Sequence, residues 1–160
     1  MGVSGCGKTT VAKLFAQKTG AVFYEGDDFH PPENVAKMRS GIPLTDEDRA
    51  AWLLALRKII FYSLVKNIFA VLTCSALKAK YRAQLRADDA RVQFVHLTGS
   101  REIIEARLKQ RSDHFMPPTL LDSQFTILEP PTGALTLSCE KFPEEIVAEL
   151  IQVLGIVPAA

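Results

Sequence analysis

The sequence predicts an α/β protein of three layers, in which helices cover both faces of a parallel β-sheet. Helical and short apolar segments alternate along the chain, as is typical of parallel strands joined by crossover helices. The chain also opens on Gly-x-x-x-x-Gly-Lys-Thr at residues 2–9, a phosphate loop of the kind that joins a strand to a helix. With 160 residues, 48% of them hydrophobic, we expect one domain over 1–160.

The loop at residues 2–9 predicts a nucleoside triphosphate site. Small residues let successive backbone N–H groups converge on phosphate oxygens at a helix N-terminus. Lys8 is expected to reach the outer phosphates of ATP, and the Thr9 hydroxyl to bind Mg²⁺. The predicted nucleotide-binding residues are Gly2, Val3, Ser4, Gly5, Cys6, Gly7, Lys8, Thr9 and Thr10.

Only Met1 precedes this loop, although such a loop ordinarily follows a buried strand. The loss of about five or six buried apolar residues removes on the order of 10 kcal/mol of burial. The sequence therefore predicts that the first central strand is largely missing, as in a short isoform, a shifted start or a fragment.

The remaining elements follow in order from local signals. A helix over 8–19 is expected to end at Gly20, with a strand at 21–25 after it. Thr45 and Asp48 predict a capping box for a long helix. Further strands are expected at 69–73, 92–97 and 135–138, and further helices from Ser100 to about Arg111, from Thr119 to Leu128 and from Pro143 to near Gly155.

Two acids after the strand at 21–25, Asp27 and Asp28, are candidates for a catalytic base. Ligands of open α/β sheets gather at the carboxyl ends of the strands, and phosphoryl transfer needs a group that accepts or orients a hydroxyl proton. The acids could instead belong to a simple turn, but the phosphate loop favours catalysis. His30, held extended before Pro31, is expected either to line a polar pocket or to pack on the loop.

Polar side chains also follow the strand at 69–73, where no carboxylate of the hydrolase type occurs. Ser75 and Lys78, with Tyr81 and Arg82 a turn further on, offer a hydroxyl and cations to a polar substrate. Each alone could lie on a solvated helix face, but together at a strand end they predict a substrate site.

Arg107 and Arg111 are four residues apart, so they share one face of a predicted helix. Two guanidinium groups at this spacing can converge on transferring phosphates if a lid closes over the site. The alternative is an exposed basic face. The proline-rich aromatic segment that follows favours a small lid at about 112–131.

Composition excludes several other classes of protein. The 19 basic residues are scattered among 18 acidic ones for a net charge of +1, which argues against nucleic acid as a partner. Three cysteines at unrelated positions suit the reducing cytoplasm better than a disulfide framework. Neither a signal peptide nor a membrane-spanning segment is predicted.

Five segments of this sequence resemble the gluconokinases, small phosphate-loop kinases related in fold to shikimate and adenylate kinases. The shared segments are MGVSGCGKT at 1–9, GDDFHP at 26–31, KMRSGIPLTDEDRAAW at 37–52, CSALKAKYRAQLR at 74–86 and RLKQRSDHFMPPTLLDSQFTILEP at 107–130. The resemblance implies a P-loop kinase fold and ATP-dependent phosphorylation of D-gluconate to 6-phospho-D-gluconate, for the pentose phosphate pathway. It also implies a possible homodimer.

The resemblance further implies roles for individual residues. Asp27 is implied to orient and deprotonate the gluconate hydroxyl, with Lys8 and Thr9 on the phosphates and Mg²⁺, and Arg107 and Arg111 as lid arginines. Contacts to gluconate are implied for His30, Arg49, Ser75, Lys78 and Arg82. Two alternatives stay open at this point: a non-catalytic form that keeps partial nucleotide or partner binding, and a kinase for another small hydroxy acid such as shikimate.

Overall fold

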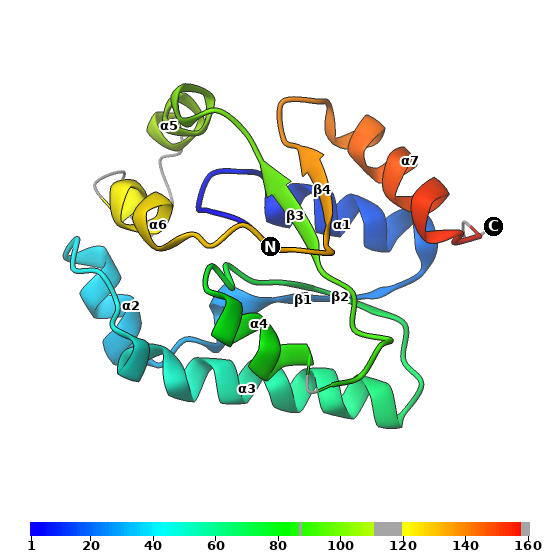
Figure 1. Ribbon diagram of the computed structural model, residues 1–160, viewed down its shortest axis with the longest axis horizontal. Coiled ribbons are helices and arrows are strands. Elements are labelled where there is room, and N and C mark those ends of the chain that lie inside the picture. The colour runs from blue at the N-terminus through cyan, green and yellow to red at the C-terminus, as the bar shows by residue number, and fades with distance from the viewer. Residues whose placement is uncertain (87, 111–119, 158–160) are drawn as a thin grey trace.

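The structure, a computed structural model, describes residues 1–86, 88–110 and 120–157. Its strands lie between two layers of helices, with α1 and α7 packed together on one side and α3 and α4 on the other (Figure 1). The elements in chain order are α1 (Lys8–Thr19), β1 (Val22–Glu25), the 3₁₀ helix η1 (Gly26–Phe29), α2 (Pro32–Arg39), α3 (Asp46–Val65), β2 (Ala70–Thr73), α4 (Ala79–Arg86), β3 (Val95–Thr98), α5 (Arg101–Lys109), α6 (Leu121–Ile127), β4 (Leu135–Ser138) and α7 (Pro143–Leu154). No helix among these is long and apolar enough to cross a membrane.

Helix ends lie where the sequence places the strongest signals. α1 ends at Gly20, whose φ of 72° lies in the left-handed region that glycine adopts readily. At the start of α3, the backbone N–H of Asp48 donates to the Thr45 hydroxyl at 3.2 Å, and the Asp48 carboxylate accepts from the Thr45 N–H at 2.9 Å. This is the expected capping box.

Other boundaries differ from the predicted ones. The strand expected at 92–97 is observed at Val95–Thr98, because Asp89 and Arg91 form a turn in which the Asp89 carboxylate accepts from the Arg91 N–H at 2.9 Å. Ser100 occupies the N-cap of α5, but its side chain makes no capping hydrogen bond. Its N–H instead donates to Glu140 at 3.0 Å. The helix expected over 119–128 is observed at Leu121–Ile127.

The strands form two separate parallel pairs. β1 pairs with β2 in the register Val22↔Ala70 to Glu25↔Thr73, and β3 pairs with β4 in the register Val95↔Leu135 to Thr98↔Ser138. All pairing in the described residues is parallel, as the sequence predicts, but it is divided between two sheets of two strands.

Met1 and Gly2 lie between these two sheets (Figure 1). On one side, the Met1 α-amino group donates to the Val95 carbonyl and the Met1 carbonyl accepts from the Leu97 N–H at 2.9 Å. On the other side, the Gly2 N–H donates to the Ser75 carbonyl at 3.4 Å. These bonds follow the pattern of a parallel ladder, so the two residues take the place of the last residues of a central strand.

A cavity of about 580 Å³ lies beside Met1 between β2 and β3. Folded interiors hold few voids larger than one water molecule, whose share of liquid volume is about 30 Å³, so close packing is interrupted here. Among the described residues the core is divided into a large cluster around α1, α7, β3 and β4, a second around Trp52 and α4, and a small third one of Met38, Leu44 and Leu120.

The buried α-amino group of Met1 predicts a dependence of stability on pH. Burial lowers its pKa from 8.0 to about 6, so between these values the unfolded chain binds more protons than the folded one. The free energy of unfolding should therefore rise from pH 6 to pH 8, by up to about 2 to 3 kcal/mol. Urea denaturation across this interval, on protein whose mass shows that Met1 is retained, measures the rise. Acetylation of the amino group should remove most of the rise and leave only the smaller part, near pH 6 to 7, that comes from the lowered pKa values of buried His30 and His96. An equal rise in acetylated protein would contradict the assignment.

Candidate active site

The loop at residues 2–9 wraps the N-terminus of α1. Gly5 and Gly7 have φ values of 84° and 87°, a region that side-chain-bearing residues rarely adopt. A Cβ at Gly5 would also lie 2.7 Å from Leu108 Cγ of α5. Glycine at these positions therefore lets the loop pass under α5 and turn into α1, whose first-turn N–H groups and positive dipole end favour an anion.

Lys8 and Gln124 hold the loop in its observed shape. The Lys8 ammonium donates to the Val3 carbonyl at 2.9 Å, so its side chain folds back over the loop. The backbone N–H of Ser4 donates to Gln124 Oε1 at 2.7 Å in a buried hydrogen bond that joins the loop to α6. Thr9 and Thr10 lie on the first turn of α1, half-buried and exposed respectively.

A small cavity of about 30 Å³ adjoins this loop and gathers residues from several regions of the chain. The end of β1 brings Asp27 and His30, the end of β2 brings Ser75, and α3 brings Arg49. The carboxyl ends of the parallel strands thus meet the phosphate loop, as the sequence predicts. The cavity is lined by Ser4, Lys8, Asp27, His30, Met38, Leu44, Arg49, Ser75, Leu77 and Gln124.

Of the two candidate bases, the structure brings Asp27 to the cavity and leaves Asp28 exposed. Before Asp27, the backbone of Gly26 lies close against the end of β2. A Cβ at Gly26 would lie 1.9 Å from the Thr73 carbonyl oxygen. The Trp52 indole also donates to the Gly26 carbonyl at 2.7 Å. η1 is therefore pressed against the end of β2, with Asp27 turned towards the loop.

His30 lines the cavity, and its ring packs on α3. Its ring stacks on Trp52 with centroids 4.4 Å apart and planes 9° from parallel, and it also lines the cavity. Within the described residues its Nδ1 is buried and has no hydrogen-bond partner. Burial, and secondly the charge of Arg49, lower the pKa of His30 to about 4, so the imidazole is neutral near pH 7.

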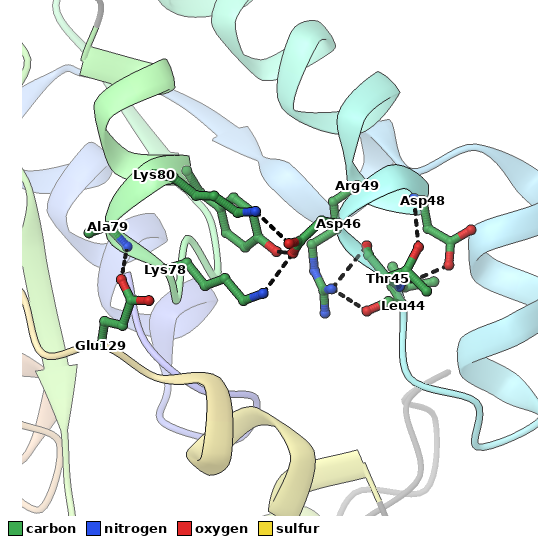
Figure 2. Close-up of polar contacts among 10 residues, drawn as sticks. Leu44, Thr45, Asp46, Asp48, Arg49, Lys78, Ala79, Lys80 and Glu129 are labelled. Atoms are coloured by element: carbon green, nitrogen blue, oxygen red, sulfur yellow. Dashed lines mark hydrogen bonds and ion pairs between the residues drawn. The ribbon is translucent and has the colours of Figure 1, made fainter.

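The cations assigned to the acceptor lie at different places. Arg49 lines the cavity and donates to the carbonyls of Leu44 and Thr45 (Figure 2). Lys78 lies outside the cavity lining and pairs with Asp46 at 2.8 Å. Hydrogen bonds from Lys78, Lys80 and Tyr81 hold the pKa of Asp46 well below its usual range. Figure 2 shows the Lys78 and Lys80 side chains converging on Asp46.

Arg82 contacts backbone in this structure. Its guanidinium donates to the carbonyls of Ala76 and Leu77, both at 3.0 Å, and the side chain is buried. Ala76 has a positive φ of 37°. Arg82 therefore supports the turn between β2 and α4, which carries Ser75, and does not line the cavity.

The sequence of this chain is similar to those of kinases. Residues 4–126 match the family model described as shikimate kinase. A gluconokinase of Gluconobacter oxydans (strain 621H) is 48% identical over 155 residues, which cover 95% of this chain and 87% of that protein. The chain belongs to the gluconokinase family.

Two solved kinase structures resemble this chain over nearly its whole length. A sugar kinase from Janibacter sp. HTCC2649 gives a TM-score of 0.92 at 43% identity, covering 99% of this chain and 93% of that one. A gluconokinase from Sinorhizobium meliloti 1021 gives a TM-score of 0.85 at 42% identity, covering 97% and 89%. The predicted family, the α/β kinase fold and the phosphotransferase class are therefore confirmed.

Part of the predicted lid of this gluconokinase-family chain lies outside the described residues. The part outside the described residues is 111–119, which includes Arg111. The predicted pairing of Arg107 with Arg111 therefore lies outside them too. Arg107 is half-buried on α5, the helix that contacts Gly5. The described remainder of the predicted lid contains α6, which contacts the loop through Gln124.

Several residues of the site were not predicted from the sequence. Gln124 lies within a segment that resembles the family, but only its contact with Ser4 singles it out from its neighbours. Met38 and Leu44 form a small apolar cluster with Leu120, which sequence periodicity does not reveal. Among the described residues, no group of acidic, histidine or cysteine side chains is able to hold a metal by itself.

Gln124 is predicted to hold the phosphate loop. Gln124→Leu removes the acceptor of the buried Ser4 N–H, so it should lower the free energy of unfolding by about 1 to 3 kcal/mol. Gln124→Glu keeps an acceptor but places a negative charge beside the loop, so it should weaken ATP binding more than it lowers stability. Urea denaturation and calorimetric titration with ATP measure the two effects.

The matched control is Asp122→Asn on the same helix, because the Asp122 side chain is 74% exposed. It should change neither quantity appreciably. Equal loss of stability in Asp122→Asn and Gln124→Leu would show that the helix as a whole, and not the Ser4 contact, is responsible.

Proposed function

We propose that this chain transfers the γ-phosphoryl group of ATP to D-gluconate, giving 6-phospho-D-gluconate. One observation carries the proposal: Asp27 and Lys8 line the same cavity, where the phosphate loop meets the ends of β1 and β2. That juxtaposition provides a carboxylate for the attacking hydroxyl and a cation for the phosphates in one place. The names of the relatives, gluconokinases of high identity, support gluconate over shikimate as the acceptor.

The phosphate loop suits ATP with Mg²⁺. Its two left-handed glycines and the N-terminus of α1 form a concave backbone surface that fits phosphate oxygens. Residues 2–10 would hold the triphosphate, and the Thr9 hydroxyl would take one position on Mg²⁺, with phosphate oxygens and waters supplying the others. Bound there, the ion would neutralise phosphate charge.

On the acceptor side, Asp27 orients the terminal hydroxyl of gluconate and takes its proton as the oxygen attacks phosphorus. His30 and Ser75 contribute polar atoms to the same cavity, and neutral His30 adds no charge near pH 7. Lys8 swings from the Val3 carbonyl to the phosphates. Arg107 on α5 neutralises charge on the transferring group, and Arg111 is proposed for the same role. Positioning and charge stabilisation of this kind account for most of the catalysis of phosphoryl transfer.

The cavity must enlarge before a sugar acid can enter. At about 30 Å³ it holds roughly one water molecule. The apolar side of the cavity is formed by Met38, Leu44 and Leu77, and the first two belong to a cluster of three buried residues, separate from the larger ones. A small cluster costs less to separate than the main core, so the α2 side is expected to move outwards on binding.

Further expectations accompany the proposal. The thiols of Cys6, Cys74 and Cys139 are free and buried, and burial raises the pKa of Cys74 to about 12. Unpaired thiols support a reducing compartment such as the cytoplasm. The product would enter the pentose phosphate pathway, and the homodimer stays a prediction that sedimentation can test.

Asp27→Asn tests the proposal most sharply. The amide keeps the size of the side chain but cannot take a proton, so kcat with gluconate should fall by roughly 10²- to 10⁴-fold while ATP affinity stays within a few-fold. Asp28→Asn is the matched control, since Asp28 is the neighbouring acid and is exposed. Equal kcat in wild type and Asp27→Asn would remove Asp27 from the role of base.

On substrate binding, the Lys78 ammonium is predicted to leave the Asp46 carboxylate and to bind the carboxylate of gluconate. Lys80 and Tyr81 also donate to the Asp46 carboxylate, so Asp46 keeps two partners when Lys78 turns to the substrate. Lys78→Met should therefore raise KM for gluconate by about 10-fold or more, with KM for ATP unchanged. Lys80→Met is the control, because Lys80 contacts the same carboxylate from a more exposed position. An equal rise in both variants would indicate a general effect of charge.

A further inference from the structure

The turn between β2 and α4, residues 74–78, carries much of the acceptor side of the candidate site. Ser75 and Leu77 line the small cavity, and Lys78, at the end of the turn, is the residue proposed to bind the substrate carboxylate. Between them, Ala76 has a φ of 37°, in the left-handed region that side-chain-bearing residues rarely adopt. Such a conformation persists only where surrounding contacts hold it. The position of these acceptor residues therefore depends on what binds the turn.

Glu129 binds this turn through its main chain and through its side chain. Its backbone N–H donates to the Leu77 carbonyl at 2.9 Å, and its carboxylate accepts from the Ala79 N–H at 2.5 Å. Ala79 is the first residue of α4, and an N–H in the first turn of a helix has no partner within that helix. A carboxylate suits this place because it also interacts favourably with the positive end of the helix dipole. Figure 2 shows the Glu129 carboxylate directed at the Ala79 N–H.

The segment that ends in Glu129 also holds the phosphate loop. Earlier in the same segment, Gln124 of α6 accepts from the Ser4 N–H at 2.7 Å in a buried hydrogen bond. Between the two contacts, Phe125 and Leu128 pack against the large core cluster. The bond to the loop and the bonds to the turn are therefore joined by one short, packed stretch of chain.

We propose that Glu129 is a positioning residue for the acceptor, which holds the turn at 74–78 in a fixed place relative to the phosphate loop. The inference rests on the proposed function, the transfer of a phosphoryl group to gluconate. Productive transfer requires the attacking oxygen to lie about 3 to 3.5 Å from phosphorus, and that distance depends on the turn on one side and on the loop on the other. Glu129 and Gln124 hold the two sides through the same stretch of chain.

Lys78 is the residue through which Glu129 acts most directly. It immediately precedes Ala79, and its ammonium pairs with Asp46 at 2.8 Å. When the Ala79 N–H loses its acceptor, the first turn of α4 is free to shift, and the Lys78 backbone shifts with it. The gluconate carboxylate then meets a misplaced cation. A cap that only stabilised α4 would instead lower the free energy of unfolding and leave KM for gluconate unchanged.

Three variants of the full chain test the proposal. Glu129→Ala removes the acceptor of the Ala79 N–H, whereas Glu129→Gln keeps an acceptor oxygen without the charge. Glu145→Ala is the matched control, because Glu145 accepts from the Phe142 N–H at 2.8 Å at the start of a different helix, α7. Each variant is measured for kcat and KM with gluconate and with ATP, for its midpoint in urea, and for hydrogen exchange at the Ala79 amide.

Glu129→Ala should speed exchange at the Ala79 amide roughly 10-fold, raise KM for gluconate by about 10-fold and leave KM for ATP within about twofold. Glu129→Gln should restore KM for gluconate to within about threefold of the wild-type value. Glu145→Ala should lower the urea midpoint without changing either KM. In the Lys78→Met background, Glu129→Ala should change KM for gluconate by less than about twofold, because the residue that it positions is gone.

Unchanged exchange at the Ala79 amide, or a further rise of about 10-fold in KM for gluconate in the Lys78→Met background, would overturn the proposal. So would an equal rise of KM for ATP and for gluconate, or the same pattern in Glu145→Ala. A wild-type protein that releases no ADP with gluconate, although exchange at Ala79 responds to Glu129→Ala, would refute the proposed function and this inference with it. A wild type that uses gluconate, with unchanged KM in Glu129→Ala, would overturn the inference alone.

Discussion

The hydrogen bonds of Met1 and Gly2 to the two flanking sheets are the constraint on which the site depends. They place the start of the phosphate loop between β2 and β3, so the loop lies at the carboxyl ends of both pairs of strands. From there Lys8 and the first turn of α1 meet Asp27 from η1 and Ser75 from the end of β2. If this junction shifted by one residue, the loop would no longer be aligned with the acid that lies across the cavity.

Three further contacts stiffen the same region from other directions. Gln124 binds the Ser4 amide from α6, α5 packs against Gly5, and Arg82 supports the turn that carries Ser75. The phosphate side of the site is thus held by backbone bonds and buried packing. The acceptor side rests on a small apolar cluster and on partly exposed ion pairs around Asp46. This asymmetry fits an enzyme that keeps its phosphate loop rigid and opens on the side of the sugar acid.

The sequence predicted the elements whose ends carry strong local signals. Gly20 ends α1, the Thr45–Asp48 box begins α3, and Pro143 and Gly155 bound α7. It missed α2 and α4 as separate helices, since each has eight residues and lacks a long apolar period. Asp27, His30, Arg49 and Ser75 were predictable because strand ends converge in such folds and because the motifs resemble a family. Gln124 and the partner of Lys78 were not, because their roles arise from contacts between segments distant in sequence.

The acceptor that this chain phosphorylates can be measured directly. ADP release from ATP with Mg²⁺ is followed with gluconate, with shikimate and without acceptor, and the product is identified by ³¹P NMR. We expect ADP release that depends on gluconate and one phosphomonoester signal from carbon 6. ADP release that is the same with and without gluconate, or that depends on shikimate instead, would contradict it.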